Sequence, residues 1–155
     1  MSGPIPPTLA HVLHLEIEVA AGIEIGTTPN GVRRIVPITG GRVSGPLMTG
    51  TVLPGGSDVQ HVRSSTETAV LAQYVIESDR EELVMIENRG VRTGSESDIA
   101  RLRNDEPVDP ANIYFRSTPV FETAAPRLAR LNDRVHVGVG ARHKGLVILD
   151  VFVVQ

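Results

Sequence analysis

Four side chains in this sequence are of types that can move a proton, and they lie in segments that read as β-strands. Asp58 follows a Gly-Gly turn, Tyr74 lies in an apolar stretch, and Arg116 and Glu122 belong to one extended segment. A carboxylate in a low-dielectric pocket has a raised pKa suited to proton transfer, and an arginine fixes a carboxylate or enolate oxygen with its fork of donors. We therefore expect Asp58 or Glu122 to act as the base. Arg116 or Tyr74 would then stabilise the developing oxyanion.

Strand alternation decides whether Arg116 and Glu122 can act together. Alternate residues of a strand share one face, so these two lie on the same side of the segment, although Pro119 between them suggests an edge, a bulge or a kink. We expect Asp58, Arg116 and Glu122 to share one pocket. The alternative is structural: these three side chains would tie strands and turns together, and Tyr74 would be a packed aromatic with a satisfied hydroxyl.

Other catalytic chemistries lack their residues. The sequence has no cysteine, so thiolate metal sites, disulfides and cysteine nucleophiles are excluded. No Gly-Lys-Ser/Thr follows the glycines and no nucleophile elbow is present. His11 and His14 are three residues apart, which on a regular strand places them on opposite faces and argues against chelation. We expect neither a metal nor a cofactor, and the chemistry points to a cofactor-independent lyase, isomerase or hydratase.

The elements that must position these groups are organised around the stretch from Pro37 to Asp58. Glycine and proline recur through it while apolar and polar residues alternate, a pattern typical of short strands that bend and approach their neighbours closely. The Gly-Gly turn at its end would aim Asp58 inward, towards the interior of a closed β-structure. Val32 to Ile38 precedes it as a strand, with Arg33 and Arg34 expected on a solvated edge.

The rest of the chain alternates with the period of strands. Leu13 to Val19 reads as a half-buried strand, and the segments Glu67 to Glu77 and Leu83 to Asn88 read as a hairpin. The one convincing helical window is Ser95 to Arg103, with Ser95 as its cap. About eight to ten short strands, with less than about a fifth of the residues helical, predict an all-β antiparallel barrel with one or two short helices.

Composition bounds the class of protein. A chain of 155 residues is expected to form one domain, residues 1–155, with residues 1–10 as an irregular lead-in. A net charge of −3 with two Tyr, three Phe and no Trp argues against nucleic-acid binding. No signal peptide or membrane span is recognisable, so a cytoplasmic location without membrane contact is expected. The final strand, Leu146 to Val154, is nearly all apolar, which predicts self-association as a two-fold homodimer.

Three blocks carry a resemblance to a known family. These are PNGVRRIVPITGGRVSGPLMTGTVLPGGSDVQ, YFRSTPVFET and LNDRVHVGVGAR, in that order and spacing. They resemble the family catalogued as domain of unknown function 3237, from about Leu13 onward. The resemblance implies a calycin-like antiparallel barrel and no settled activity. Val59, Leu128 and Arg130 stand where members usually carry aromatic residues, so aromatic stacking is not carried over to these positions.

Two functions from different classes fit these observations. The first is an enzyme that moves a proton on a small, partly apolar organic molecule inside the barrel. The second is a non-catalytic ligand-binding or carrier barrel, whose interior polar groups only orient the ligand. The position of the acidic and basic side chains relative to an interior cavity separates the two.

Overall fold

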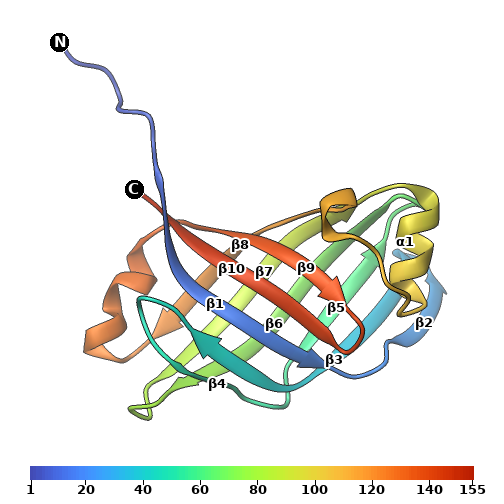
Figure 1. Cartoon of the computed structure of the whole chain (residues 1–155), viewed down its shortest axis with the longest axis horizontal. Coiled ribbons are helices and arrows are strands. Elements are labelled where there is room, and N and C mark those ends of the chain that lie inside the picture. The colour runs from blue at the N-terminus through green and yellow to red at the C-terminus, as the bar shows by residue number, and fades with distance from the viewer.

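Ten strands form one antiparallel sheet that closes on itself in the computed structural model, which describes residues 1–155 (Figure 1). The strands are β1 (Leu9–Val19), β2 (Ile23–Thr28), β3 (Gly31–Ser44), β4 (Gly50–Val52), β5 (Ser57–Val62), β6 (Glu67–Ser78), β7 (Leu83–Thr93), β8 (Tyr114–Thr123), β9 (His136–His143) and β10 (Leu146–Val154). The order β1-β10-β9-β8-β7-β6-β4-β3 returns to β1 by direct pairing of β1 with β3, while β5 lies beside β4 between β3 and β6. The predicted antiparallel barrel is confirmed, with eight positions around its wall.

Closure of the barrel depends on β3, the longest strand. Its first half pairs with β2 and β5, and its second half pairs with β1 and β4. Gly41 lies in the second half at φ 142°, opposite Ile17, and a Cβ there would overlap the carbonyl oxygen of Glu16. Only glycine lets the two backbones approach this closely. The close approach expected of the glycine-rich stretch is therefore confirmed at the pairing that closes the barrel.

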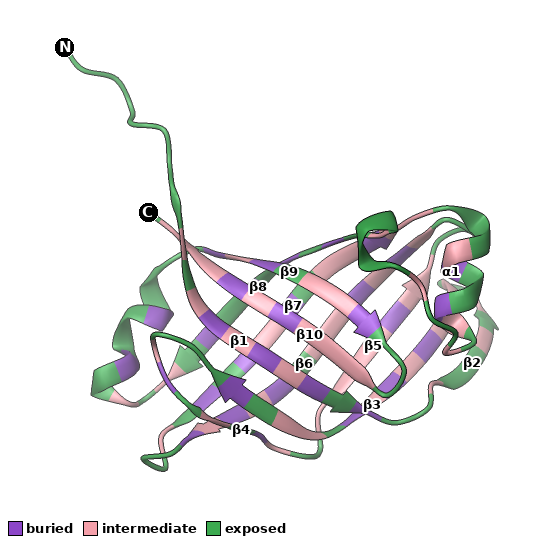
Figure 2. Ribbon diagram, viewed as in Figure 1, coloured by how far each residue is buried: buried purple, intermediate pink, exposed green.

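The inward-facing side chains divide the interior into an apolar end and a polar end. Buried and exposed residues alternate along the strands, as Figure 2 shows. A core cluster of 18 buried residues extends from one end, where Leu128 and Leu131 of the 3-10 helix η2 (Pro126–Asp133) cover it, to residues such as Leu149 that line the cavity in the interior. The other end buries Arg34, Arg92 and Arg142 near the helix α1 (Glu96–Arg103). The barrel therefore carries its interior charges at one end.

The helices close the ends of the barrel. The α-helix α1 begins at the predicted cap, where Ser95 accepts a hydrogen bond from the backbone N–H of Asp98 at 3.1 Å, and it buries Ile99 and Leu102. A short 3-10 helix, η1 (Pro110–Asn112), follows it. The helical content is as low as predicted. None of the helices combines the length and apolarity needed to cross a lipid bilayer.

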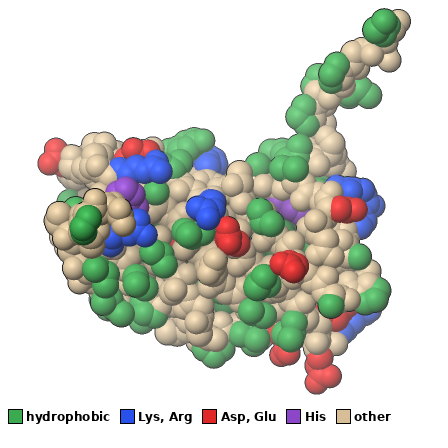
Figure 3. All heavy atoms as spheres, turned by 180° about the vertical axis from the view of Figure 1, so that it is seen from behind, with side chains coloured by type: hydrophobic (Ala, Val, Ile, Leu, Met, Phe, Trp, Pro, Cys, Tyr) green, Lys and Arg blue, Asp and Glu red, His purple; other side chains and the backbone are tan.

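The outer wall carries charged and apolar side chains in a mixed pattern. Figure 3 shows red, blue and green groups dispersed over one face. In β10, Asp150 interrupts the apolar run, and Val151 is fully buried in the core. Self-association through this strand stays a prediction.

Replacement of Gly41 by alanine should destabilise the fold more than replacement of Gly26. Both glycines have positive φ, at 142° and 93°, but an added Cβ meets nothing within 4 Å at Gly26 and overlaps a backbone oxygen at Gly41. Gly26→Ala should cost about 1–2 kcal/mol of unfolding free energy from backbone strain alone. Gly41→Ala should cost about 1–3 kcal/mol more. Urea unfolding measures both, and equal losses would contradict this account of closure.

Candidate functional site

A small cavity of about 50 Å³ lies inside the polar end of the barrel. Ten of its 15 lining residues are hydrophobic, so the polar groups project into a mostly apolar space. Several strands contribute those groups. The five polar lining residues are Asp58 and Gln60 from β5, Asn88 and Arg92 from β7, and Arg142 from β9; Tyr74 from β6, one of the ten, adds a hydroxyl group.

Asp58 is the only acid that lines the cavity. The turn before it packs on β6, because a Cβ at Gly56 would lie 2.5 Å from the carbonyl oxygen of Gln73, and this contact sets the start of β5. The carboxylate accepts hydrogen bonds from Gln60 Nε2 at 2.8 Å and from the backbone N–H of Leu71 at 3.0 Å. Asp58 therefore faces the interior, as its position after the glycine turn predicted.

Burial raises the pKa of Asp58 above its ordinary value, more than its hydrogen bonds and the nearby arginines lower it. Asp58 is densely surrounded by protein atoms, yet it keeps an intermediate solvent accessibility because it borders the cavity. Such a carboxyl group can hold or release a proton in contact with a molecule in that space.

Tyr74 is the second predicted site residue that lines the cavity. Its side chain is 4% exposed, and its hydroxyl group has no hydrogen-bond partner. Burial, and then the negative charge of Asp58, raise the pKa of the phenol. Tyr74 therefore remains a neutral hydrogen-bond donor at ordinary pH, near the acid.

Arg92 places a cation in the cavity without an ion-pair partner. Its side chain is 3% exposed, its Nε atom has no hydrogen-bond partner, and no carboxylate lies within ion-pair distance. The guanidinium carbon lies 5.7 Å from the ring centroid of Phe115. Burial lowers the pKa of Arg92 to about 10, so the side chain still carries its charge near neutral pH.

The other two buried arginines have carboxylate partners at the mouth of the barrel. Arg142 Nη2 donates to Asp105 Oδ1 at 2.9 Å. Arg34 Nε lies 2.9 Å from Glu24 Oε1, an ion pair whose angle is too bent for a hydrogen bond, which leaves this nitrogen without a hydrogen-bonded partner. Glu24 also lies 3.7 Å from Arg103 of α1. These ion pairs connect β2 and the segment around α1 to the barrel interior.

Arg116 and Glu122 do not line the cavity, so the expectation that they share a pocket with Asp58 is wrong. Both are exposed, and Arg116 stacks over Tyr114 at 5.1 Å on the outer wall. The alternation along β8 was predicted correctly, but the face that carries Phe115 points inward and the face that carries Arg116 points to solvent.

Proline in β8 ends a pairing without breaking the register. Pro119 lies opposite Asn88 of β7, and the alternation of buried and exposed residues continues past it. Pairing with β9 covers only Arg116 with Val139 and Ser117 with Gly138. The predicted edge is thus found on the β9 side, where Pro119 has no N–H to donate.

Two sequence expectations about other residues are corrected. Arg34 was expected on a solvated edge but is 4% exposed and faces inward. His11 and His14 were expected on opposite faces, yet the register of β1 shifts between His11 and Leu13. Both imidazoles therefore contact Asp150 Oδ1, at 2.9 Å from His11 and 2.8 Å from His14. The bulge adds one residue to the spacing and brings the two rings to one side.

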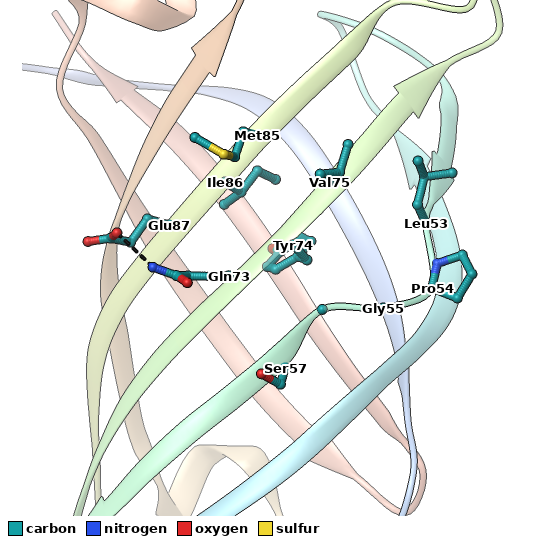
Figure 4. Close-up of a pocket in the computed structure, with 11 residues that line it drawn as sticks. Leu53, Pro54, Gly55, Ser57, Gln73, Tyr74, Val75, Met85, Ile86 and Glu87 are labelled. Carbon is teal, nitrogen blue, oxygen red and sulfur yellow. Dashed lines mark hydrogen bonds between the residues drawn. The ribbon is translucent and has the colours of Figure 1, made fainter.

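A larger groove of about 510 Å³ lies on the outer wall, where the loop after β4 meets β6 and β7 (Figure 4). Its one carboxylate is Glu87, which accepts a hydrogen bond from Gln73 at 3.0 Å and pairs with Arg89 at 3.3 Å. A carboxylate engaged in this way on the surface is a weak candidate for proton transfer. The convergence of acid, phenol and guanidinium makes the interior cavity the candidate site.

Comparisons with known proteins agree with this fold. The profile of the family described as Protein of unknown function (DUF3237) matches residues 7–154. The UPF0311 protein RPA1785 from Rhodopseudomonas palustris is 43% identical over 134 residues, 86% of each chain. Its crystal structure, described as that of a conserved protein of unknown function, covers 99% of this chain and 100% of that one, with a TM-score of 0.92 and 37% identity.

Two further solved structures resemble the chain. A beta-barrel like protein from Acinetobacter baumannii AYE covers 100% of both chains, with a TM-score of 0.87 and 34% identity. An enzyme from Penicillium herquei covers 100% of this chain and 99% of that one with a TM-score of 0.73. Its sequence identity is only 15%, so this likeness concerns the fold alone.

The free energy of unfolding should depend on pH differently in the wild type and in the variant Asp58→Asn, which has no carboxyl group to titrate at this position. Below the ordinary pKa of 3.8, both the folded and unfolded states hold the Asp58 proton. As pH rises above that value, the unfolded state releases the proton first, because the folded-state pKa is raised. The unfolding free energy of the wild type should therefore fall relative to Asp58→Asn, by at most about 1.4 kcal/mol per pH unit, until pH passes the raised pKa.

Urea unfolding of both proteins from pH 3 to pH 8 (roughly the range in which a perturbed carboxyl titrates) measures this difference. If the unfolding free energy of the wild type instead increases relative to that of Asp58→Asn as pH rises, Asp58 is an ion-paired structural carboxylate with a lowered pKa.

Proposed function

Because the chain belongs to the DUF3237 family, whose description names no activity, we propose its function from the barrel interior: the protein binds a small, partly apolar organic molecule there and moves a proton on it. The reaction uses general acid–base catalysis and needs no cofactor, as in an isomerase, lyase or hydratase. The single observation that carries this proposal is Asp58, a carboxyl group of raised pKa that borders a mostly apolar cavity inside the barrel.

Asp58 is the acid and base of the proposed reaction. Gln60 and the Leu71 N–H fix the carboxylate orientation, so its proton is delivered in one direction. A raised pKa brings the carboxyl group towards the range in which it both accepts and returns a proton.

Tyr74 and Arg92 stabilise the negative charge that proton removal creates on the bound molecule. Tyr74 has a free hydroxyl donor, and Arg92 has a free Nε–H donor and a positive charge. Donors that are buried and already oriented stabilise an oxyanion more than mobile water does. In the proposal, Tyr74 keeps the role that the sequence suggested for Arg116 or Tyr74, and Arg92 takes the place of Arg116.

The alternative is a non-catalytic binding or carrier barrel. The ion pairs of Arg34 with Glu24 and of Arg142 with Asp105 favour it, because they connect the mouth of the barrel to the segments that cover it. A covered interior suits retention of a ligand as well as catalysis. The two functions differ in the need for Asp58, since a carrier requires no proton transfer.

Two features of the setting also belong to this proposal. A chain without cysteine suits the reducing cytoplasm. Exposed apolar side chains on the outer wall, such as Met85 at 53% and Val120 at 65%, would suit a two-fold dimer.

Proton transfer should be visible as deuterium gain. We expect the wild-type protein, incubated in D2O with an extract of small metabolites, to label at least one compound at a carbon-bound hydrogen, as read by mass spectrometry. Asp58→Asn should slow this labelling by about 10²- to 10⁴-fold, because it removes the base and keeps the shape.

Glu122→Gln is the matched control, since this carboxylate is exposed on the outer wall and its loss should leave labelling unchanged. Equal labelling by wild type and Asp58→Asn would remove the proposed function. Compounds that bind but never gain deuterium would assign the carrier role instead.

A further inference from the structure

The charges at the polar end of the barrel do not balance. Arg34, Arg92 and Arg142 are each less than 9% exposed. Glu24 pairs with Arg34 and Asp105 pairs with Arg142, both at 2.9 Å. Arg92 has no ion pair and no side-chain hydrogen bond through its buried Nε. Asp58 is the one other acid at the cavity, so a positive charge is left over inside the barrel while Asp58 holds its proton.

Asp58 does not neutralise Arg92 by contact. Its two carboxylate oxygens accept from Gln60 Nε2 and from the Leu71 N–H, and no ion pair joins it to the guanidinium. A buried cation without a bound anion is costly, because burial removes the water that would solvate it. Buried charges in proteins are ordinarily paired, so the position beside Arg92 suits a bound anion.

The excess of one positive charge favours a monoanion over a dianion. A phosphate dianion would need a second free cation, and the other two guanidiniums already have carboxylate partners. A guanidinium binds a carboxylate through two parallel hydrogen bonds, and Arg92 has an unpaired Nε and no ion pair with another side chain.

The walls of the cavity limit the rest of the molecule. Val70, Val147 and Leu149 line it beside Phe115, so the part of the ligand away from its charge must be apolar. A volume of about 50 Å³ admits only a short chain. It is far below the roughly 300–1,000 Å³ of sites that hold drug-sized ligands.

Two further polar atoms face this space without partners. The Tyr74 hydroxyl group and Asn88 Oδ1 are both buried and unpaired. The Tyr74 hydroxyl group can donate to an oxygen of a bound molecule, whereas Asn88 Oδ1 only accepts and would need a donor that a simple carboxylate does not carry. A second oxygen on the ligand would accept from Tyr74.

We propose that the interior cavity binds a short-chain monocarboxylate, with its carboxylate on the Arg92 guanidinium, its chain against Val70, Val147 and Leu149, and any second oxygen on Tyr74. This inference rests on the proposed function, for which it names the substrate class. Proton transfer by Asp58 then takes place on a carbon of this carboxylate.

Calorimetric titration with four probes tests the substrate class on the wild-type protein. Propionate and pyruvate are the carboxylates, propionamide is the neutral analogue of the first, and inorganic phosphate is the competing anion. We expect propionate and pyruvate to bind one per chain, and propionamide to bind about tenfold more weakly or worse. Propionamide that binds as tightly as propionate would overturn the proposal, and so would phosphate that binds where both carboxylates fail.

Arg92→Gln and Arg116→Gln are the matched pair of variants, because the first guanidinium is buried in the cavity and the second is exposed on the adjacent strand. We expect Arg92→Gln to weaken propionate binding by about tenfold or more and Arg116→Gln to leave it unchanged. Arg92→Lys keeps the charge without the fork and covers the case in which Arg92→Gln does not fold. A lowered melting temperature in Arg92→Gln with propionate binding unchanged would make Arg92 a structural residue.

The same reagents separate this inference from the proposed function. Propionate binding that depends on Arg92, without any deuterium transfer, would support the carboxylate site and exclude the proton-transfer function. Deuterium transfer that depends on Asp58 but is confined to uncharged compounds would support the proton-transfer function and exclude the carboxylate class.

Discussion

Burial of the Arg92 guanidinium without an ion pair is the constraint on which this account of the protein depends. An uncompensated charge inside a barrel lowers stability, and mutation to a neutral residue is an easy way to remove it. The guanidinium of Arg92 lies over the ring of Phe115. The charges of Asp58, Arg142 and Arg34 also change the pKa of Arg92. Asp58 raises the pKa of both Arg92 and Tyr74, so the acid couples the cation and the phenol electrostatically.

The barrel wall is what brings these three groups together. Asp58, Tyr74 and Arg92 lie on three consecutive positions of the sheet, β5, β6 and β7, and all three project inward. Their placement requires that the glycine-rich stretch bend β3 far enough to reach β1, because an open sheet would expose this face to water. Gly41 and Gly56 serve the site indirectly, the first through closure and the second through the packing of the turn before Asp58.

The sequence predicts the alternation of the strands well and the direction of each face poorly. The Gly-Gly turn marks Asp58 as inward-facing. Periodicity shows which residues of a strand share a face but not which face is buried, so it predicts the wrong side for Arg116. The predicted strand ends at Asn88, but β7 continues to Thr93, and the same alternation places Arg92 two steps beyond Asn88 on the inward face. Arg34 alternates with buried neighbours too, but a charged residue at the start of a strand ordinarily marks a solvated edge.

Anomalous diffraction from crystals soaked in sodium bromide tests most directly whether the barrel interior is a site for a single anion. Bromide is a monoanion small enough for the cavity, and its anomalous signal locates it without reference to its surroundings. We expect one bromide inside the barrel, on the Arg92 guanidinium and close to Asp58 and Tyr74, and we expect it to be lost in crystals of Arg92→Gln. Bromide peaks confined to exposed arginines on the outer wall, with none beside Arg92, would contradict an anion site inside the barrel.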